Sequence, residues 1–123
     1  MIGKYEYLLS FNFLLNKFVK QHKKAGKIRD YNIPIEDYNF YSFYNILQND
    51  FDIESMVVRL DDWNDIEELS FPAIAFLKIN GGIFVLMHDY RDGKVFWESK
   101  EYGKQVNTFG LFKKISDQVF LIS

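Results

Sequence analysis

The sequence contains no cysteine, and it has only two prolines and seven glycines among its 123 residues. Without cysteine the chain has no thiol nucleophile, no disulfide bond and no zinc or iron–sulfur centre held by thiolates. It also lacks an uncharged apolar run of about 18 residues, which a membrane-spanning helix needs, and its N-terminus lacks the apolar core of an export signal. We therefore expect the chain itself neither to cross a membrane nor to carry an ordinary export signal.

Aromatic residues, in contrast, are abundant: 13 Phe, 8 Tyr and 2 Trp make up 19% of the chain. The 48% of hydrophobic and 26% of charged residues are typical of a globular protein. A chain of this length buries roughly two thirds of the surface that it exposes when unfolded, which is enough for one core. We expect a single domain over residues 1–123, with a helical part at 1–50 and a sheet part at 51–123.

The formal net charge of −2 conceals an uneven distribution. Residues 1–29 carry seven Lys and Arg, whereas residues 30–68 carry eleven Asp and Glu. These segments are either two binding surfaces or two elements that attract each other, and the second interpretation is favoured. The lysine-rich N-terminal segment also has the composition of a helix that lies on a membrane surface. The acidic total and the core-like spacing of the aromatic residues speak against nucleic acid as a partner.

The first 50 residues contain two helical patterns. Apolar residues between Phe11 and Val19 recur at helical spacing, which predicts an amphipathic helix with Ser10 as its N-cap and Gly26 as its stop signal. A second helix is expected from about Asn39, after a turn at Pro34. Its apolar face comprises Phe40, Phe43, Tyr44 and Leu47.

After Asp50 the pattern changes to that of strands, and the chain is therefore expected to have an α+β fold. Asn80-Gly81-Gly82 has the glycines that a hairpin turn needs. Short helical turns are expected at Asp61–Leu69 and Thr108–Ile115. The expected strands are Ile53–Leu60, Pro72–Ile79, Ile83–Tyr90, Val95–Ser99, Gln105–Asn107 and Gln118–Ile122.

The two histidines, His22 and His88, lie far apart in the sequence, and neither has a second ligand at metal-binding spacing. We expect no metal site, with His22 at a helix end and His88 at a solvent-facing strand end. A serine hydrolase would have to use Ser10 with one of these histidines. No local motif such as Gly-x-Ser-x-Gly supports that arrangement.

Several pieces of the second half follow one another in a familiar order. They are Phe-Pro-Ala-Ile-Ala at Phe71–Ala75, an apolar strand at Ile83–Leu86, Gly-Lys-Val-Phe at Gly93–Phe96 and a closing strand at Val119–Ile122. The helix expected at Phe40–Phe51 fits the same order. In these features the sequence resembles the bacteriocin-processing cysteine peptidases, which are papain-like domains that cleave double-glycine leaders and are fused to peptide-exporting ABC transporters.

The resemblance implies three catalytic positions, and each has lost the residue of the family. The catalytic cysteine opens the first helix, where Ser10 is the nearest counterpart. The general-base histidine corresponds to Gly82, and the orienting aspartate falls within Glu98-Ser99-Lys100, at Ser99. A thiolate–imidazolium mechanism needs the thiol and a proton acceptor. The resemblance therefore implies a degenerate member without peptidase activity and without a cofactor.

The resemblance further implies a peptide or protein segment as ligand, extended along the cleft between helices and sheet. The positions that it places along this cleft are Asn12, Asn80, Gly82, Ile83 and Trp97. Similar domains without catalytic residues precede the membrane domains of peptide or toxin exporters, or vitamin K epoxide reductase domains of bacterial membrane proteins. We therefore expect the N-terminal domain of a larger membrane protein, on the cytoplasmic side. A hydrolase that uses Ser10 and a free-standing interaction protein are the alternatives.

Overall fold

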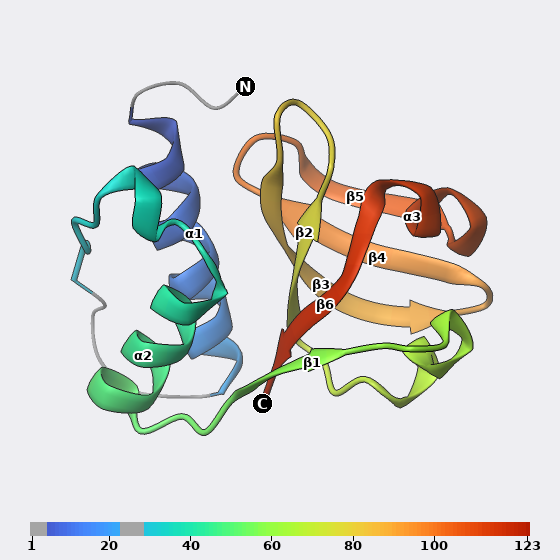
Figure 1. Ribbon diagram of the computed structural model, residues 1–123, viewed down its shortest axis with the longest axis horizontal. Helices are drawn as coiled ribbons and strands as arrows, with labels where there is room; N and C mark the ends of the chain where they lie inside the picture. The colour runs from blue at the N-terminus through green and yellow to red at the C-terminus, as the bar shows by residue number, and fades with distance from the viewer. Residues whose placement is uncertain (1–4, 23–28) are drawn as a thin grey trace.

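The computed structural model describes residues 5–22 and 29–123, and it has an α+β fold in which two helices pack on a six-stranded antiparallel sheet (Figure 1). The helices are α1 (Glu6–Gln21), α2 (Phe40–Phe51) and α3 (Phe109–Ile115), with 3-10 turns η1 (Ile35–Asp37) and η2 (Trp63–Glu68). The strands are β1 (Met56–Arg59), β2 (Ala73–Leu77), β3 (Ile83–Arg91), β4 (Lys94–Ser99), β5 (Gly103–Thr108) and β6 (Ser116–Ile122). Their order in the sheet is β1-β6-β2-β3-β4-β5. None of the described helices is long and apolar enough to cross a membrane.

Both faces of the central strands are buried. On β3, Phe84 and Leu86 face the cluster formed with α1 and α2, whereas Val85 and Met87 face the cluster that includes Phe112 of α3. Because both faces are buried, the sequences of β2 and β3 are continuous apolar runs. Within each run, successive side chains still alternate between the two faces of the sheet.

Most of the predicted elements are present, and the start of the first helix is the main correction. The helix begins at Glu6 with Tyr5 as its N-cap, so the predicted N-cap role of Ser10 is wrong. Ser10 instead lies within the helix and is fully buried. The predicted stop at Gly26 lies outside the described residues. The first strand is also shorter than predicted, because β1 begins only at Met56.

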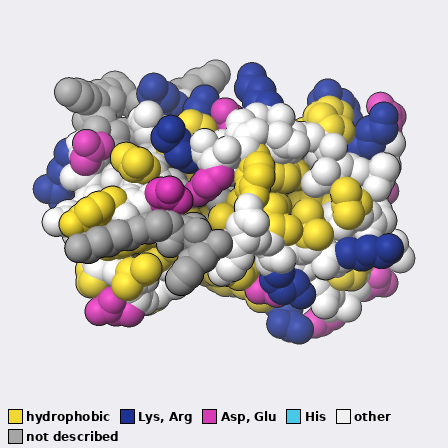
Figure 2. All heavy atoms as spheres, turned by 90° about the horizontal axis from the view of Figure 1, so that it is seen from above, with side chains coloured by type: hydrophobic (Ala, Val, Ile, Leu, Met, Phe, Trp, Pro, Cys, Tyr) yellow, Lys and Arg dark blue, Asp and Glu magenta, His cyan; other side chains and the backbone are white. Residues whose placement is uncertain are grey.

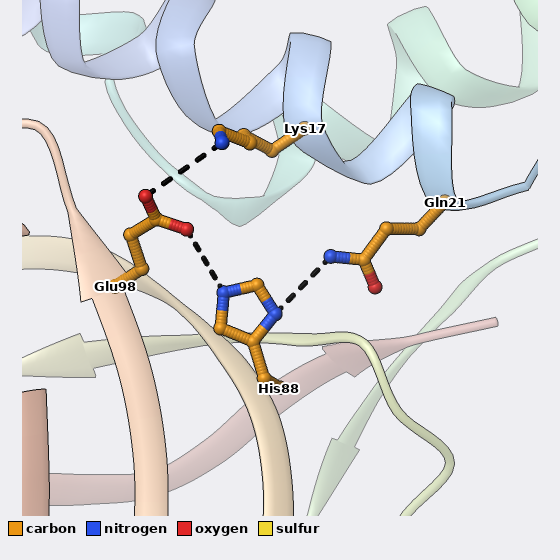
Figure 3. A network of polar contacts seen from close by, with 4 residues as sticks. All are labelled: Lys17, Gln21, His88 and Glu98. Atoms are coloured by element: carbon orange, nitrogen blue, oxygen red, sulfur yellow. Dashed lines mark hydrogen bonds and ion pairs between the residues drawn. The ribbon is translucent and has the colours of Figure 1, made fainter. Parts of the chain in front are cut away.

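A polar network ties the second half of α1 to the sheet (Figure 3). Glu98 of β4 accepts from His88 Nε2 at 3.0 Å and lies 3.7 Å from Lys17 Nζ. The other ring nitrogen of His88 is 3.1 Å from the side-chain amide of Gln21. The predicted solvent-facing place of His88 is therefore wrong. His88 lies within β3 and faces α1, as the alternation from Phe84 through Leu86 already indicates.

Glu98 is the most buried member of this network, since its side chain is only 10% exposed. We expect Glu98→Ala to lower the free energy of unfolding by about 1–3 kcal/mol, because two donors lose their acceptor next to the core. The matched control is Glu67→Ala, which removes an exposed carboxylate of η2 and should change stability by less than about 0.5 kcal/mol. Urea unfolding of both variants measures this, and equal losses would contradict a role for the network.

Candidate functional site

At one end of the molecule the first turns of α1 approach the β2–β3 turn and the β4–β5 turn (Figure 1). The two turns are linked because the side-chain amide of Asn80 donates a hydrogen bond to the hydroxyl of Tyr102. A cavity of about 320 Å³ opens between α1 and the β4–β5 turn, and it is lined by Glu6, Leu9, Lys100 and Glu101. We call this region, from α1 across Asn80–Gly82 to Lys100–Tyr102, the corner.

The corner presents both apolar and charged groups to solvent. The side chain of Leu9 is 58% exposed and that of Tyr102 is 39% exposed. Seen from this end, hydrophobic side chains gather over the sheet, and acidic side chains lie between them and the helices (Figure 2). Exposed apolar groups beside backbone turns are suited to contacts with an extended chain.

Ser10, which the sequence resemblance implies as the nearest counterpart of the nucleophile, is fully buried. Its hydroxyl is 2.8 Å from the hydroxyl of Tyr38. Burial raises the pKa of Tyr38 to about 12, with the Ser10 hydrogen bond acting in the opposite direction. Tyr38 therefore keeps its proton at neutral pH, and the hydroxyls of Ser10 and Tyr38 are hydrogen-bonded to each other.

The structure does not bring Ser10 to a histidine. His22 contacts Phe18 and Ser123, and His88 contacts Gln21 and Glu98.

Gly82, which the sequence resemblance implies as the counterpart of the general base, lies directly against the ring of Phe76. A Cβ at position 82 would lie 3.1 Å from both Cε1 and Cε2 of that ring and closer still to Cζ. The backbone of Gly82 has φ +102°, outside the range that residues with a side chain adopt comfortably. The position is therefore closed to any side chain, histidine included, as long as Phe76 keeps its place.

Ser99, which the sequence resemblance implies as the counterpart of the orienting acid, is only 1% exposed. Its hydroxyl accepts a hydrogen bond from the backbone N–H of Tyr102 at 2.9 Å. Ser99 thus closes the β4–β5 turn and offers no carboxylate to a base. No three His, Asp or Glu side chains within residues 5–22 and 29–123 gather as metal ligands would.

The five candidate positions for peptide contact do not form one surface. Asn80 and Gly82 lie at the corner, whereas Ile83 and Trp97 are only 1% and 4% exposed and belong to the core. Asn12 holds the backbone of Tyr31 through hydrogen bonds of 2.7 and 3.0 Å and lines a second cavity, of about 410 Å³, which shares only Leu9 with the cavity at the corner. Direct side-chain contact with a ligand at the corner is therefore open to Asn80 and not to Ile83 or Trp97.

Sequence reasoning missed the side chains that shape the corner. Leu9 lies before the helix start that the sequence suggested, so its exposed position on α1 was not foreseen. The place of Phe76 follows from the hairpin register, in which Phe76 pairs with Phe84 and Leu77 with Ile83. Counting back from the Asn80–Gly82 turn gives this register, but it does not give the contact between the ring and Gly82.

The packing of Phe76 on Gly82 predicts a position-specific cost. We expect Gly82→Ala to lower the free energy of unfolding by at least about 2 kcal/mol more than Gly103→Ala. Gly103 is a matched control because it also has positive φ, +67°, yet a Cβ there meets no atom within 4 Å. Thermal and urea unfolding measure the difference, and similar losses at both sites would refute the close packing.

Comparisons with known proteins agree with this architecture. A scan against protein-family models found no match, and a search of curated proteins also found none. Among solved structures, the chain is similar to a double glycine motif protease from an AMS/PCAT transporter, solved in complex with the leader peptide. The match has a TM-score of 0.69 at 16% sequence identity and covers 89% of this chain and 79% of that one. The chain therefore has the papain-like fold of the double-glycine peptidases, as the sequence resemblance implied.

Proposed function

We propose that this chain is a peptidase-like domain that binds an extended peptide segment at the corner without cleaving it. The observation that carries this proposal is the Phe76 ring on Gly82, because it occupies the space where a base would project. The absence of cysteine from the chain and the buried, hydrogen-bonded hydroxyl of Ser10 point the same way. Acyl transfer needs a nucleophile and a base within hydrogen-bond reach of each other, and neither histidine contacts Ser10.

Peptide binding is supported by what the corner retains. The solved protease of the same fold is in complex with a leader peptide, so this fold can bind a peptide in another protein. In this chain Leu9 provides an exposed apolar contact, and Lys100 and Glu101 provide charges at the rim of the cavity. The exposed turn at Asn80 adds a polar side chain close by. This combination suits recognition of a short extended segment by backbone contacts and one or two side-chain pockets.

The same proposal places the domain next to a membrane protein and on the cytoplasmic side. The solved structure of the same fold comes from a transporter, which favours an exporter as the attached or neighbouring membrane domain. A vitamin K epoxide reductase fusion is the second context, in which the domain would act on a redox partner. In either setting the domain regulates its neighbour by holding a peptide segment.

The first test concerns catalysis. We expect a fluorophosphonate probe to leave Ser10 unlabelled and a double-glycine leader peptide to remain intact, because the Ser10 hydroxyl is buried and paired with Tyr38. Mass spectrometry of the protein and of the peptide measures both outcomes. Labelling or cleavage that disappears in Ser10→Ala would instead establish the chain as a serine hydrolase.

The second test concerns binding. Titration of the ¹⁵N-labelled chain with the leader peptide should shift the amides of Asn80, Gly82 and Lys100. Leu9→Asp should weaken binding by about tenfold, since it replaces an apolar contact by a charge. Leu111→Asp is the matched control, because Leu111 is a similarly exposed leucine on α3. The proposal would be contradicted if no amide at the corner shifted at millimolar peptide, or if the two variants changed the affinity for the peptide equally.

A further inference from the structure

The strand β1 has an open edge. Among the described residues it pairs only with β6, and it is the last strand on its side of the sheet. The N–H of Leu60 donates to the carbonyl of Gln118 at 2.8 Å, which fixes the phase of the antiparallel ladder. Because hydrogen-bonded and non-hydrogen-bonded pairs alternate, the backbone groups of Val57 and Arg59 point away from β6. Within residues 5–22 and 29–123 no other strand pairs with these groups.

A cavity of about 480 Å³ lies at the start of this edge, between the end of α2 and the end of β6. Met56 and Val57 are 56% and 46% exposed there, so the edge has an apolar surface. The hydroxyl of Ser55 is buried and has no hydrogen-bond partner in the described part of the chain. The lining comprises Gln48, Glu54, Ser55, Met56, Ser70, Ile122 and Ser123.

The segment that contains β1 is strongly acidic. Residues 52–68 carry seven Asp and Glu and one basic residue, Arg59. Glu54 lines the cavity itself. The carboxylates of η2 and of the turn before it are exposed, and they form no ion pair with any of the residues that the structure describes. Such a field attracts cationic partners and repels a second copy of the same edge.

We propose that the β1 edge binds an extended lysine- or arginine-rich segment of another protein by strand addition. Its backbone pairs with the outward groups of Val57 and Arg59. One basic side chain enters the cavity, where its aliphatic stem lies on Met56 and Ile122 and its charge meets Glu54. This surface is separate from the corner, since β1 lies at the opposite end of the molecule (Figure 1).

The probe for this proposal is a capped seven-residue peptide that alternates lysine with valine, titrated into the ¹⁵N-labelled chain. We expect saturable shifts of the amides from Ser55 to Arg59. A peptide with glutamate in place of lysine should bind at least about tenfold more weakly, and added salt should weaken the lysine peptide. Equal binding of the two peptides would refute the charge selection, and shifts confined to the corner would refute the site.

Two variants separate strand addition from general charge attraction. Val57→Pro removes an outward N–H without removing a bond to β6, and it should weaken the lysine peptide by about tenfold or more. The matched control is Val106→Pro on β5, where the bond from Phe109 N–H to Gly93 places Val106 in the same outward phase. It should leave binding unchanged.

Glu54→Lys tests the cavity independently of the strand backbone. If the NMR spectrum of Val57→Pro shows that this variant is unfolded, Glu54→Lys alone tests whether the lysine peptide binds at the β1 edge. It should also weaken the lysine peptide by about tenfold or more. Unchanged binding in Glu54→Lys and in a folded Val57→Pro would overturn the proposal. So would self-association of the free chain through β1, which would make a second copy the occupant.

Discussion

The packing of α2 on the sheet is centred on one aromatic side chain, Phe84 of β3. Four rings surround it, at centroid distances from 4.9 to 5.6 Å and with edge-to-face geometry. They belong to Tyr38, Phe40, Phe43 and Phe76. Edge-to-face pairs add a preferred orientation to the area that they bury, so the entry into α2 and the β2–β3 hairpin are held in one arrangement.

The same cluster sets the chemistry of the corner. Tyr38 packs against Phe84 and simultaneously satisfies the hydroxyl of Ser10, while Phe76 packs against Phe84 and covers Gly82. Two of the three positions that the resemblance marks as catalytic thus contact aromatic residues of this cluster. Part of the abundant aromatic content of the sequence lies in this cluster.

Local signals in the sequence were sufficient for most of the fold. Asn39 begins α2 as predicted, since its side chain accepts from Ser42 N–H at 3.1 Å. The start of α1 was missed because its N-cap, Tyr5, makes no side-chain capping bond and so leaves no capping residue to recognise. The face of the sheet on which the His88 side chain lies could have been predicted from the alternation of side chains along β3. The contact of Phe76 with Gly82 could not, because it depends on how the hairpin twists in three dimensions.

The ring on Gly82 has a consequence for how such a domain can evolve. A histidine introduced at position 82 in the present background would first disrupt the hairpin, and it would gain no function without a nucleophile. Shrinking Phe76 beforehand would open a hole beside Phe84, which is itself destabilising. Each single substitution that would lead toward a base at position 82 is therefore expected to lower the stability of the fold.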